Sequence, residues 1–96
     1  LQSGQLNNGH GVFTVIAVPE GSARQISFGL DNHAQNVPIA RLRVAIFDTA
    51  WHTHPDVVID GNRGLQSIAF PNPAKTGVVS IRRNDAGTQA IGYVIH

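Results

Sequence analysis

Short apolar runs separated by turn residues recur along the whole chain, and they constrain the fold more than any other feature of the sequence. Val, Ile, Phe and Thr alternate with clusters of Gly, Pro, Asn and Asp, whereas the spacing of an amphipathic helix is hard to find. The pattern predicts strands at residues 12–18, 23–30, 40–48, 57–59, 65–70, 77–83 and 88–95. The polar segments 31–38 and 49–55 are expected to be connections.

Alternation within the predicted strands divides their side chains between two faces. In residues 40–48 the apolar positions form the inward face, and Arg41 and Arg43 fall on the outward face. The same parity places Arg82 outward on a later strand. Residues 12–18 are apolar at positions of both parities, which predicts burial on both faces.

About seven short strands in 96 residues predict an all-β domain, an antiparallel β-sandwich of jelly-roll or immunoglobulin-like topology. A small closed barrel shows the same alternation and is the alternative. The length suits one hydrophobic core, so residues 1–96 are taken as a single domain, with residues 1–10 as a candidate flexible leader. The longest apolar run, Val15–Val18, is far shorter than the roughly 20 residues of a membrane-spanning helix.

Composition excludes several functional classes. The chain has no Cys, which excludes disulfides, thiolate zinc sites, iron–sulfur clusters and cysteine nucleophiles. Seven Lys and Arg stand against six Asp and Glu, for a formal net charge of +1. This balance leaves no surplus to neutralise a phosphate backbone, so nucleic acid is not an expected partner.

The densest polar cluster of the sequence contains two histidines two residues apart. On an extended backbone His52 and His54 would point to the same side about 6.5 Å apart, within reach of one zinc or copper ion. Asp56 is the nearest candidate for a further ligand, with Asp48 and His33 as others. The alternative is that these are solvated loop residues beside the single Trp of the chain.

Calcium is a weaker possibility. Asp56, Asp60, Asn62 and Asp85 offer oxygen ligands, but the sequence lacks a run of alternating carboxylates that ends in Glu. Asp60 and Asn62 are better explained as residues that hydrogen-bond their own turn. No cofactor is therefore expected.

Three arginines and the Trp are candidates for ligand contact. Arg41, Arg43 and Arg82 would form a small cationic patch for a carboxylate, a sulfate or an acidic sugar if their strands were neighbours. Alternatively, their stems cover apolar surface while their charged ends remain in water. Trp51 is either an exposed ring that contacts sugar or protein, or a partly buried side chain.

Motifs of catalysis are missing from the sequence. No serine lies in a Gly-x-Ser-x-Gly elbow, and no Gly cluster leads into a phosphate-binding helix. Little chain is left over for an active site once the strands and turns are assigned. The chain is therefore not expected to be an enzyme.

The order of turns and strands resembles the bacterial pre-peptidase C-terminal domain, a small β-sandwich appended to secreted peptidases. The motifs that carry the resemblance are Leu1-x-x-Gly4-Gln5, Phe13-Thr14-Val15, Val18-Pro19-Glu20-Gly21, Gln25-Ile26-Ser27-Phe28, the strand ending in Phe47-Asp48, Asn72-Pro73 before Gly77 and its strand 78–81, and Tyr93. The resemblance implies a non-catalytic extracellular accessory module of a larger bacterial secreted protein, for substrate attachment, secretion or stability. Its partner would be an attached catalytic domain or an extracellular polymer.

Two other functions stay open from the sequence. One is a stand-alone small-ligand binder, either a sugar-binding lectin or a metal binder that uses His52 and His54. The other is a structural or assembly subunit that pairs through an open edge strand.

Overall fold

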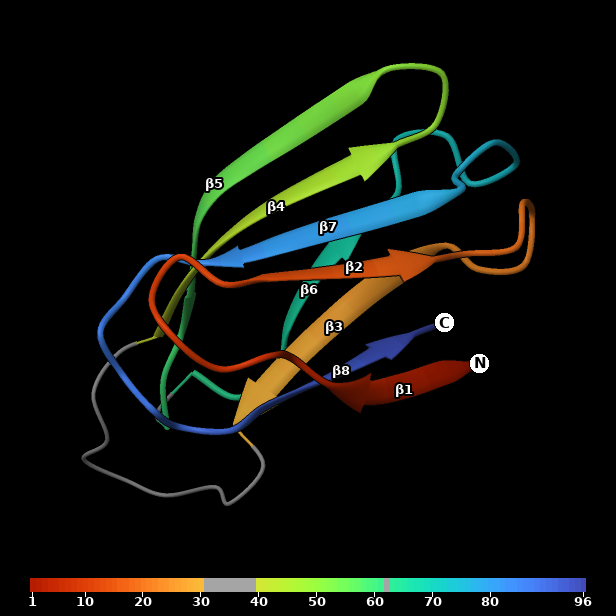
Figure 1. Cartoon of the computed structure of the whole chain (residues 1–96). Coiled ribbons are helices and arrows are strands. Elements are labelled where there is room, and N and C mark those ends of the chain that lie inside the picture. Colours follow the sequence, from red (N-terminus) through yellow and green to blue (C-terminus); the bar gives the residue numbers. More distant parts are fainter. Residues whose placement is uncertain (31–39, 62) are drawn as a thin grey trace.

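Two four-stranded antiparallel sheets pack into a sandwich in the computed structural model, which describes residues 1–30, 40–61 and 63–96 (Figure 1). The strands are β1 (Gln2–Gln5), β2 (Phe13–Ala17), β3 (Gln25–Leu30), β4 (Ala40–Phe47), β5 (Trp51–Ile59), β6 (Gln66–Ala69), β7 (Val78–Arg83) and β8 (Ile91–Ile95). The predicted all-β sandwich is confirmed. The closed barrel is wrong, because each sheet ends in two edge strands.

The strand order identifies the topology of the sandwich. One sheet has the order β1-β8-β3-β6 and the other the order β2-β7-β4-β5. Among the described strands, only β4 and β5 follow each other within one sheet, and every other consecutive pair crosses between the sheets. Eight strands in this order form a jelly roll, one of the two sandwich topologies predicted.

The strand that the sequence did not indicate lies within residues 1–10. β1 pairs with β8, from Gln2 opposite Ile95 to Gln5 opposite Gly92, and Leu6 after it is buried. Residues 2–5 are therefore an edge of the sheet and not a flexible leader. β1 contains no β-branched or aromatic residue, which is why its composition did not predict a strand.

The connection predicted at residues 49–55 is also wrong, because β5 already begins at Trp51. The pairing of β4 with β5 shifts at Arg43, where the chain opposite has an extra residue, and Asp56 takes a φ of 57° there. Such a bulge reverses the parity of inward and outward residues partway along the strand. The alternation of inward and outward residues is therefore interrupted within residues 51–59. For this reason the sequence pattern predicted only the end of β5, residues 57–59, as a strand. The other predicted connection, residues 31–38, lies outside the described residues.

The core lies between the two sheets and is almost entirely aliphatic. Its largest fully buried apolar residues are Ile26, Phe28, Leu42, Val44, Ile46, Ile59, Val79, Ile81, Ile91 and Ile95. Residues 12–18 are an exception to the predicted burial. Ile16 points into the core, but Phe13 is 55% exposed and Val15 is 68% exposed, because nothing in the described structure covers the outer side of β2.

Candidate binding face

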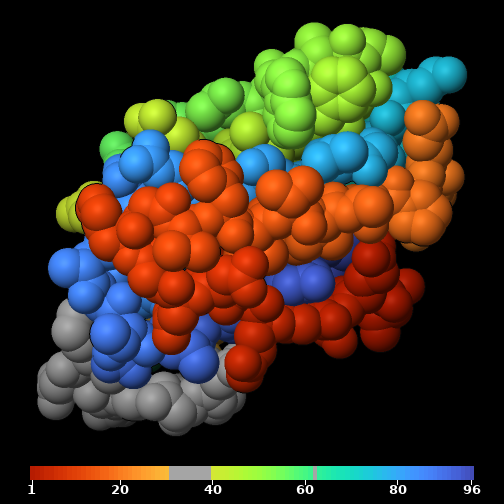
Figure 2. All heavy atoms as spheres, in the orientation of Figure 1, coloured from red at the N-terminus to blue at the C-terminus, as the bar shows by residue number. Residues whose placement is uncertain are grey.

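The outer side of the β2-β7-β4-β5 sheet brings together three large exposed apolar side chains, Phe13, Val15 and Trp51, and three arginines. Strand register aligns its side chains in rows across the sheet. We call this surface the aromatic–arginine face and define it by Phe13, Val15, Ala17, Arg41, Arg43, Ala45, Phe47, Trp51, Thr53, Val78, Ser80 and Arg82. In the space-filling view β2, β7 and β5, in orange, blue and green, form one continuous surface across the upper part of the molecule (Figure 2).

The apolar end of the aromatic–arginine face is built around Trp51. Its ring packs edge-on against Phe47, with a centroid separation of 5.1 Å and an interplanar angle of 61°. Trp51 lies at the edge of the sheet and is 54% exposed. Of the two interpretations of this residue, an exposed ring or a partly buried side chain, the structure agrees with the exposed ring. The contact with Phe47 orients the indole while leaving much of its surface to solvent.

The opposite end of the face carries the arginines. Arg43 on β4 lies directly opposite Arg82 on β7, and Arg41 follows two residues away on the same side of β4. The condition for the predicted cationic patch, that the strands be neighbours, is met. None of the salt bridges between described residues includes these three side chains. No carboxylate of the described residues therefore lies within salt-bridge distance of the patch.

Arg82 is held by packing and not by a carboxylate. Its Cζ atom lies 5.8 Å from the centre of the Phe13 ring, which is the distance of a cation–π contact. Its Nε is buried and has no hydrogen-bond partner in the described structure. The guanidinium is thus positioned by an aromatic ring, while its terminal nitrogens are not committed to any carboxylate among the described residues.

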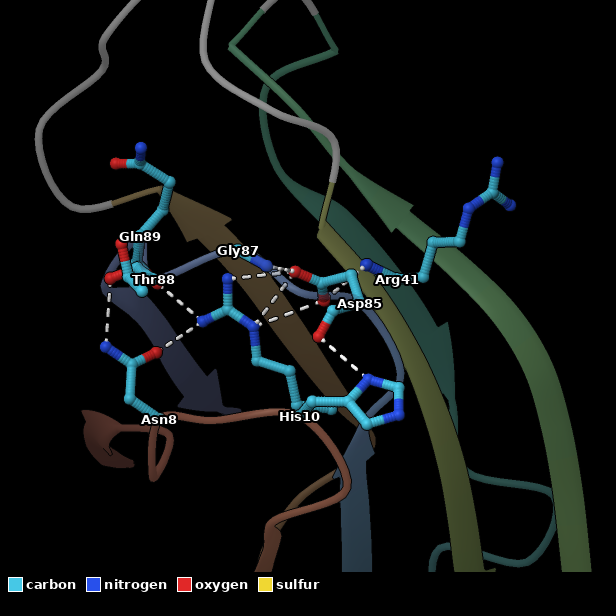
Figure 3. A network of polar contacts seen from close by, with 8 residues as sticks. Asn8, His10, Arg41, Asp85, Gly87, Thr88 and Gln89 are labelled. Atoms are coloured by element: carbon cyan, nitrogen blue, oxygen red, sulfur yellow. Dashed lines mark hydrogen bonds and ion pairs between the residues drawn. The ribbon is translucent and has the colours of Figure 1, made fainter.

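The next residue, Arg83, has the opposite environment. It is 1% exposed, and its guanidinium donates to the carboxylate of Asp85, to the side-chain oxygen of Asn8 and to the carbonyl of Gln89 (Figure 3). The cluster joins the β1–β2 connection to the β7–β8 connection. No separate role was predicted for Arg83, whose parity placed it inward. An inward arginine two residues before an Asp was the indication of an ion pair.

Asp85 is the centre of this cluster. Burial raises the pKa of its carboxyl, but hydrogen bonds from Arg83 and from the backbone N–H groups of Arg41 and Gly87 outweigh burial and hold that pKa below the usual 3.8. Only the backbone of Arg41 reaches Asp85, and its side chain points away from the cluster (Figure 3). Asp85 therefore forms its ion pair with Arg83 and forms none with an arginine of the aromatic–arginine face.

The two histidines proposed as metal ligands lie on β5. His52 pairs with Ile46 and His54 with Val44, so both lie on the inward side of the strand. The two-residue spacing predicted that they would share one side. Asp56 sits at the bulge. Among the residues that the structure describes, no group of three His, Cys, Asp or Glu side chains is placed to hold a metal ion. His33 lies outside those residues.

His52 already has a partner in Asp48. Its Nε2 lies 3.0 Å from each oxygen of that carboxylate. Asp48 also accepts the N–H groups of Thr49 and Ala50, so it closes the β4–β5 turn. The bond from Thr49 is the main reason why the pKa of Asp48 is below 3.8, and His52 and Ala50 lower it further against the effect of burial. The pair thus has a structural role in the turn.

Two of the three carboxylates considered for calcium are engaged in other contacts, and the third, Asp56, is exposed at the bulge of β5. Asp60 accepts from Nε of Arg63 at 2.9 Å, and Asp85 accepts from Arg83. Asn62 lies outside the described residues. These contacts agree with the turn role that the sequence favoured for Asp60.

The outer side of the other sheet, β1-β8-β3-β6, carries a Ser–His contact. The Ser27 hydroxyl lies 2.9 Å from Nε2 of His96 and 2.7 Å from the hydroxyl of Ser67. The Gln25 side-chain nitrogen lies 3.3 Å from Nδ1 of His96, so the imidazole is held between Gln25 and Ser27. These contacts link β3, β6 and His96 on this outer face.

The edges of the β2-β7-β4-β5 sheet bear on the assembly alternative. On β2, Asn7 donates its side-chain N–H to the carbonyl of Phe13 at 3.1 Å, and Gln2 donates to the carbonyl of Ala17 at 3.2 Å. On β5, Pro55 lacks an N–H and lies beside the bulge. Both features obstruct the addition of another strand.

Comparison with known proteins finds no match to any family model, curated protein sequence or solved structure. No helix that is long and apolar enough to cross a membrane occurs in the described part of the chain. The function is therefore inferred from the geometry of the two outer faces.

Proposed function

We propose that the chain is a non-catalytic binding module that holds an extracellular polymer against the aromatic–arginine face, as an accessory part of a larger secreted bacterial protein. The observation that supports binding at this face is the exposure of Phe13, Val15 and Trp51, each more than half exposed, on one side of a single sheet. Large apolar groups gathered in this way are typical of interaction sites. The secreted, accessory setting is supported by the motifs shared with pre-peptidase C-terminal domains.

The shape of the face favours a polymer over a small molecule. Small ligands are usually enclosed in pockets that bury most of their surface. The aromatic–arginine face is instead an open side of a sheet, across which an extended chain can lie. From Arg43 to Phe47 along β4 the face measures about 13 Å, enough for more than one unit of a polymer.

The alternatives have less support. A metal ion at His52 would have to separate its Nε2 from the Asp48 carboxylate, which it contacts at 3.0 Å. An assembly subunit would need a free edge. Both edges of the β2-β7-β4-β5 sheet are obstructed by Asn7, Gln2 and Pro55, so assembly would have to use β1 or β6 of the other sheet.

The test is retention of the purified chain on immobilised polysaccharides: cellulose, chitin, polygalacturonate and dextran sulfate. Trp51→Ala should weaken binding about tenfold, because stacking of a nucleic-acid base on an aromatic ring contributes roughly 1–3 kcal/mol and we take a sugar ring at the lower end of this range. Leu65→Ala is the matched control, since Leu65 is a large exposed apolar residue that lies beside the opposite outer face. Absence of binding to every polymer, or equal losses in the two variants, would refute the proposal.

A further inference from the structure

The arginine end of the aromatic–arginine face has an unusual arrangement of charge. Arg43 and Arg82 are direct cross-strand neighbours, a position in which Cβ atoms are about 4.5–5.5 Å apart. Like charges at such positions destabilise a sheet. No described residue forms a salt bridge with either side chain. An anion bound between the two guanidinium groups would turn this repulsion into attraction.

The surroundings of Arg82 prepare it for such an anion. The Phe13 ring lies against its guanidinium on one side. Gly11 lies close by, and a Cβ added there would be 3.6 Å from Nη2. Because the contact with Phe13 restricts the side chain before any ligand binds, less conformational entropy is lost on binding.

The nearby carboxylate of Asp85 is directed elsewhere. It accepts from Arg83 and from the backbone of Arg41, while the Arg41 side chain points away from it (Figure 3). Arg41 therefore extends the positive end of the face along β4, and three guanidinium groups stand at this end without a salt bridge to any described residue.

We infer that this end of the face selects an acidic polysaccharide, with carboxylate or sulfate groups seated on Arg43 and Arg82 and sugar rings stacked toward Trp51. This inference rests on the proposed function and names the class of polymer. The planar guanidinium donates two parallel hydrogen bonds to a carboxylate or sulfate. The exposed indole offers a flat surface to the C–H groups of a sugar ring.

Charge favours a polysaccharide over a nucleic acid. Nucleic-acid interfaces are strongly positive, whereas this chain has a formal net charge of only +1. Of its seven basic residues, Arg83 and Arg63 are paired with Asp85 and Asp60. Three arginines at one end of a face form a small positive patch, not the extended positive surface that is typical of nucleic-acid interfaces.

The experiment measures dissociation constants of the whole chain for polygalacturonate, dextran sulfate, neutral dextran and oligothymidylate at low and high salt. The double variant Arg43→Gln/Arg82→Gln should weaken binding to an acidic polysaccharide by about tenfold or more. The control Arg24→Gln/Lys75→Gln removes the same charge from exposed residues outside the face and should change binding less than about threefold. Preference for polygalacturonate or for dextran sulfate distinguishes carboxylate from sulfate as the ligand.

The outcomes separate this inference from the proposed function. Equal binding of neutral and acidic polysaccharides that still depends on Trp51 overturns the inference and leaves the binding module intact. Tighter binding to oligothymidylate, or equal losses in both double variants, also overturns it. No binding to any polymer overturns both. If circular dichroism shows that the double variant does not fold, the single variant Arg43→Gln is measured in its place, with Arg24→Gln as its control.

Discussion

Arg82 and Arg83 are consecutive residues of β7 with the same chemistry and opposite surroundings. Arg83 lies in a buried cluster in which its guanidinium has acceptors in Asp85, Asn8 and Gln89. Arg82 lies on the aromatic–arginine face beside Phe13 and opposite Arg43, and its Nε has no acceptor in the described structure. The alternation of a strand is sufficient to separate one arginine that stabilises the fold from another that is available to a ligand.

The two arginines differ in whether their polar atoms have hydrogen-bond partners within the described structure. A buried charge is tolerated only when its hydrogen bonds and counter-charge are supplied by the protein. The cluster around Arg83 meets this requirement, and the aromatic–arginine face does not supply a carboxylate from the described residues. Variants in the cluster should therefore change stability, and variants on the face should change binding.

The largest expected effect is on stability, from Arg83→Met. Removal of the guanidinium leaves Asp85 buried without its counter-charge, which should lower the free energy of unfolding by about 3–5 kcal/mol. Arg82→Met is the matched control and should change it by less than about 1 kcal/mol, since only a cation–π contact is lost. Urea denaturation followed by tryptophan fluorescence measures both. Equal losses would show that the two arginines do not differ in the way described.

A smaller effect is expected from acid. The folded-state pKa values of Asp85 and Asp48 lie below 3.8, so the unfolded chain takes up protons first as the pH falls. The stability that these carboxylates contribute is present above the unfolded pKa and is lost as the pH falls through the folded pKa. The urea midpoint should therefore decrease from about pH 5 downward.

The share of Asp85 in this acid effect can be isolated with Asp85→Asn, which should lower the stability at neutral pH and flatten its dependence on pH below about 5. Asp56→Asn, at the exposed bulge of β5, keeps the buried cluster and should retain the acid sensitivity of the unaltered chain. An unchanged pH profile in Asp85→Asn would contradict the role assigned to the cluster.

The smallest effect is expected from Val15→Thr on the aromatic–arginine face. The side chain is 68% exposed, and Thr keeps the β-branched shape, so the free energy of unfolding should change by no more than about 0.5 kcal/mol. Thermal denaturation provides the measurement. A loss of more than about 1.5 kcal/mol would mean that this face is part of the packed structure and not a surface left for a partner.

Much of the sandwich could be predicted from the sequence because most strands keep a regular alternation. In β4 and β7 the inward apolar residues and outward arginines were assigned correctly, and this alone placed Arg41, Arg43 and Arg82 on outer surfaces. What alternation cannot give is which strands are neighbours. The cross-strand pair Arg43–Arg82 depends on the crossover order of the jelly roll, which no local pattern specifies.

The remaining errors have local physical causes. β5 was shortened in the prediction because the bulge at Asp56 reverses its parity and because His, Pro and Asp are poor strand formers. Phe13 and Val15 were predicted to be buried because hydrophobicity alone does not show that β2 lies at an edge with an uncovered side.

The pairing of β1 with β8 has a consequence for how the chain acquires its structure. Gln2 lies opposite Ile95, at the far end of the sequence. Of the consecutive strand pairs in the described structure, all but β4 and β5 cross between the sheets. Contacts so distant in sequence close large loops, and proteins dominated by them fold in milliseconds to seconds. During synthesis β1 cannot join its sheet until residues 91–95 have been made. Until then the newly made chain would expose apolar strands to other molecules.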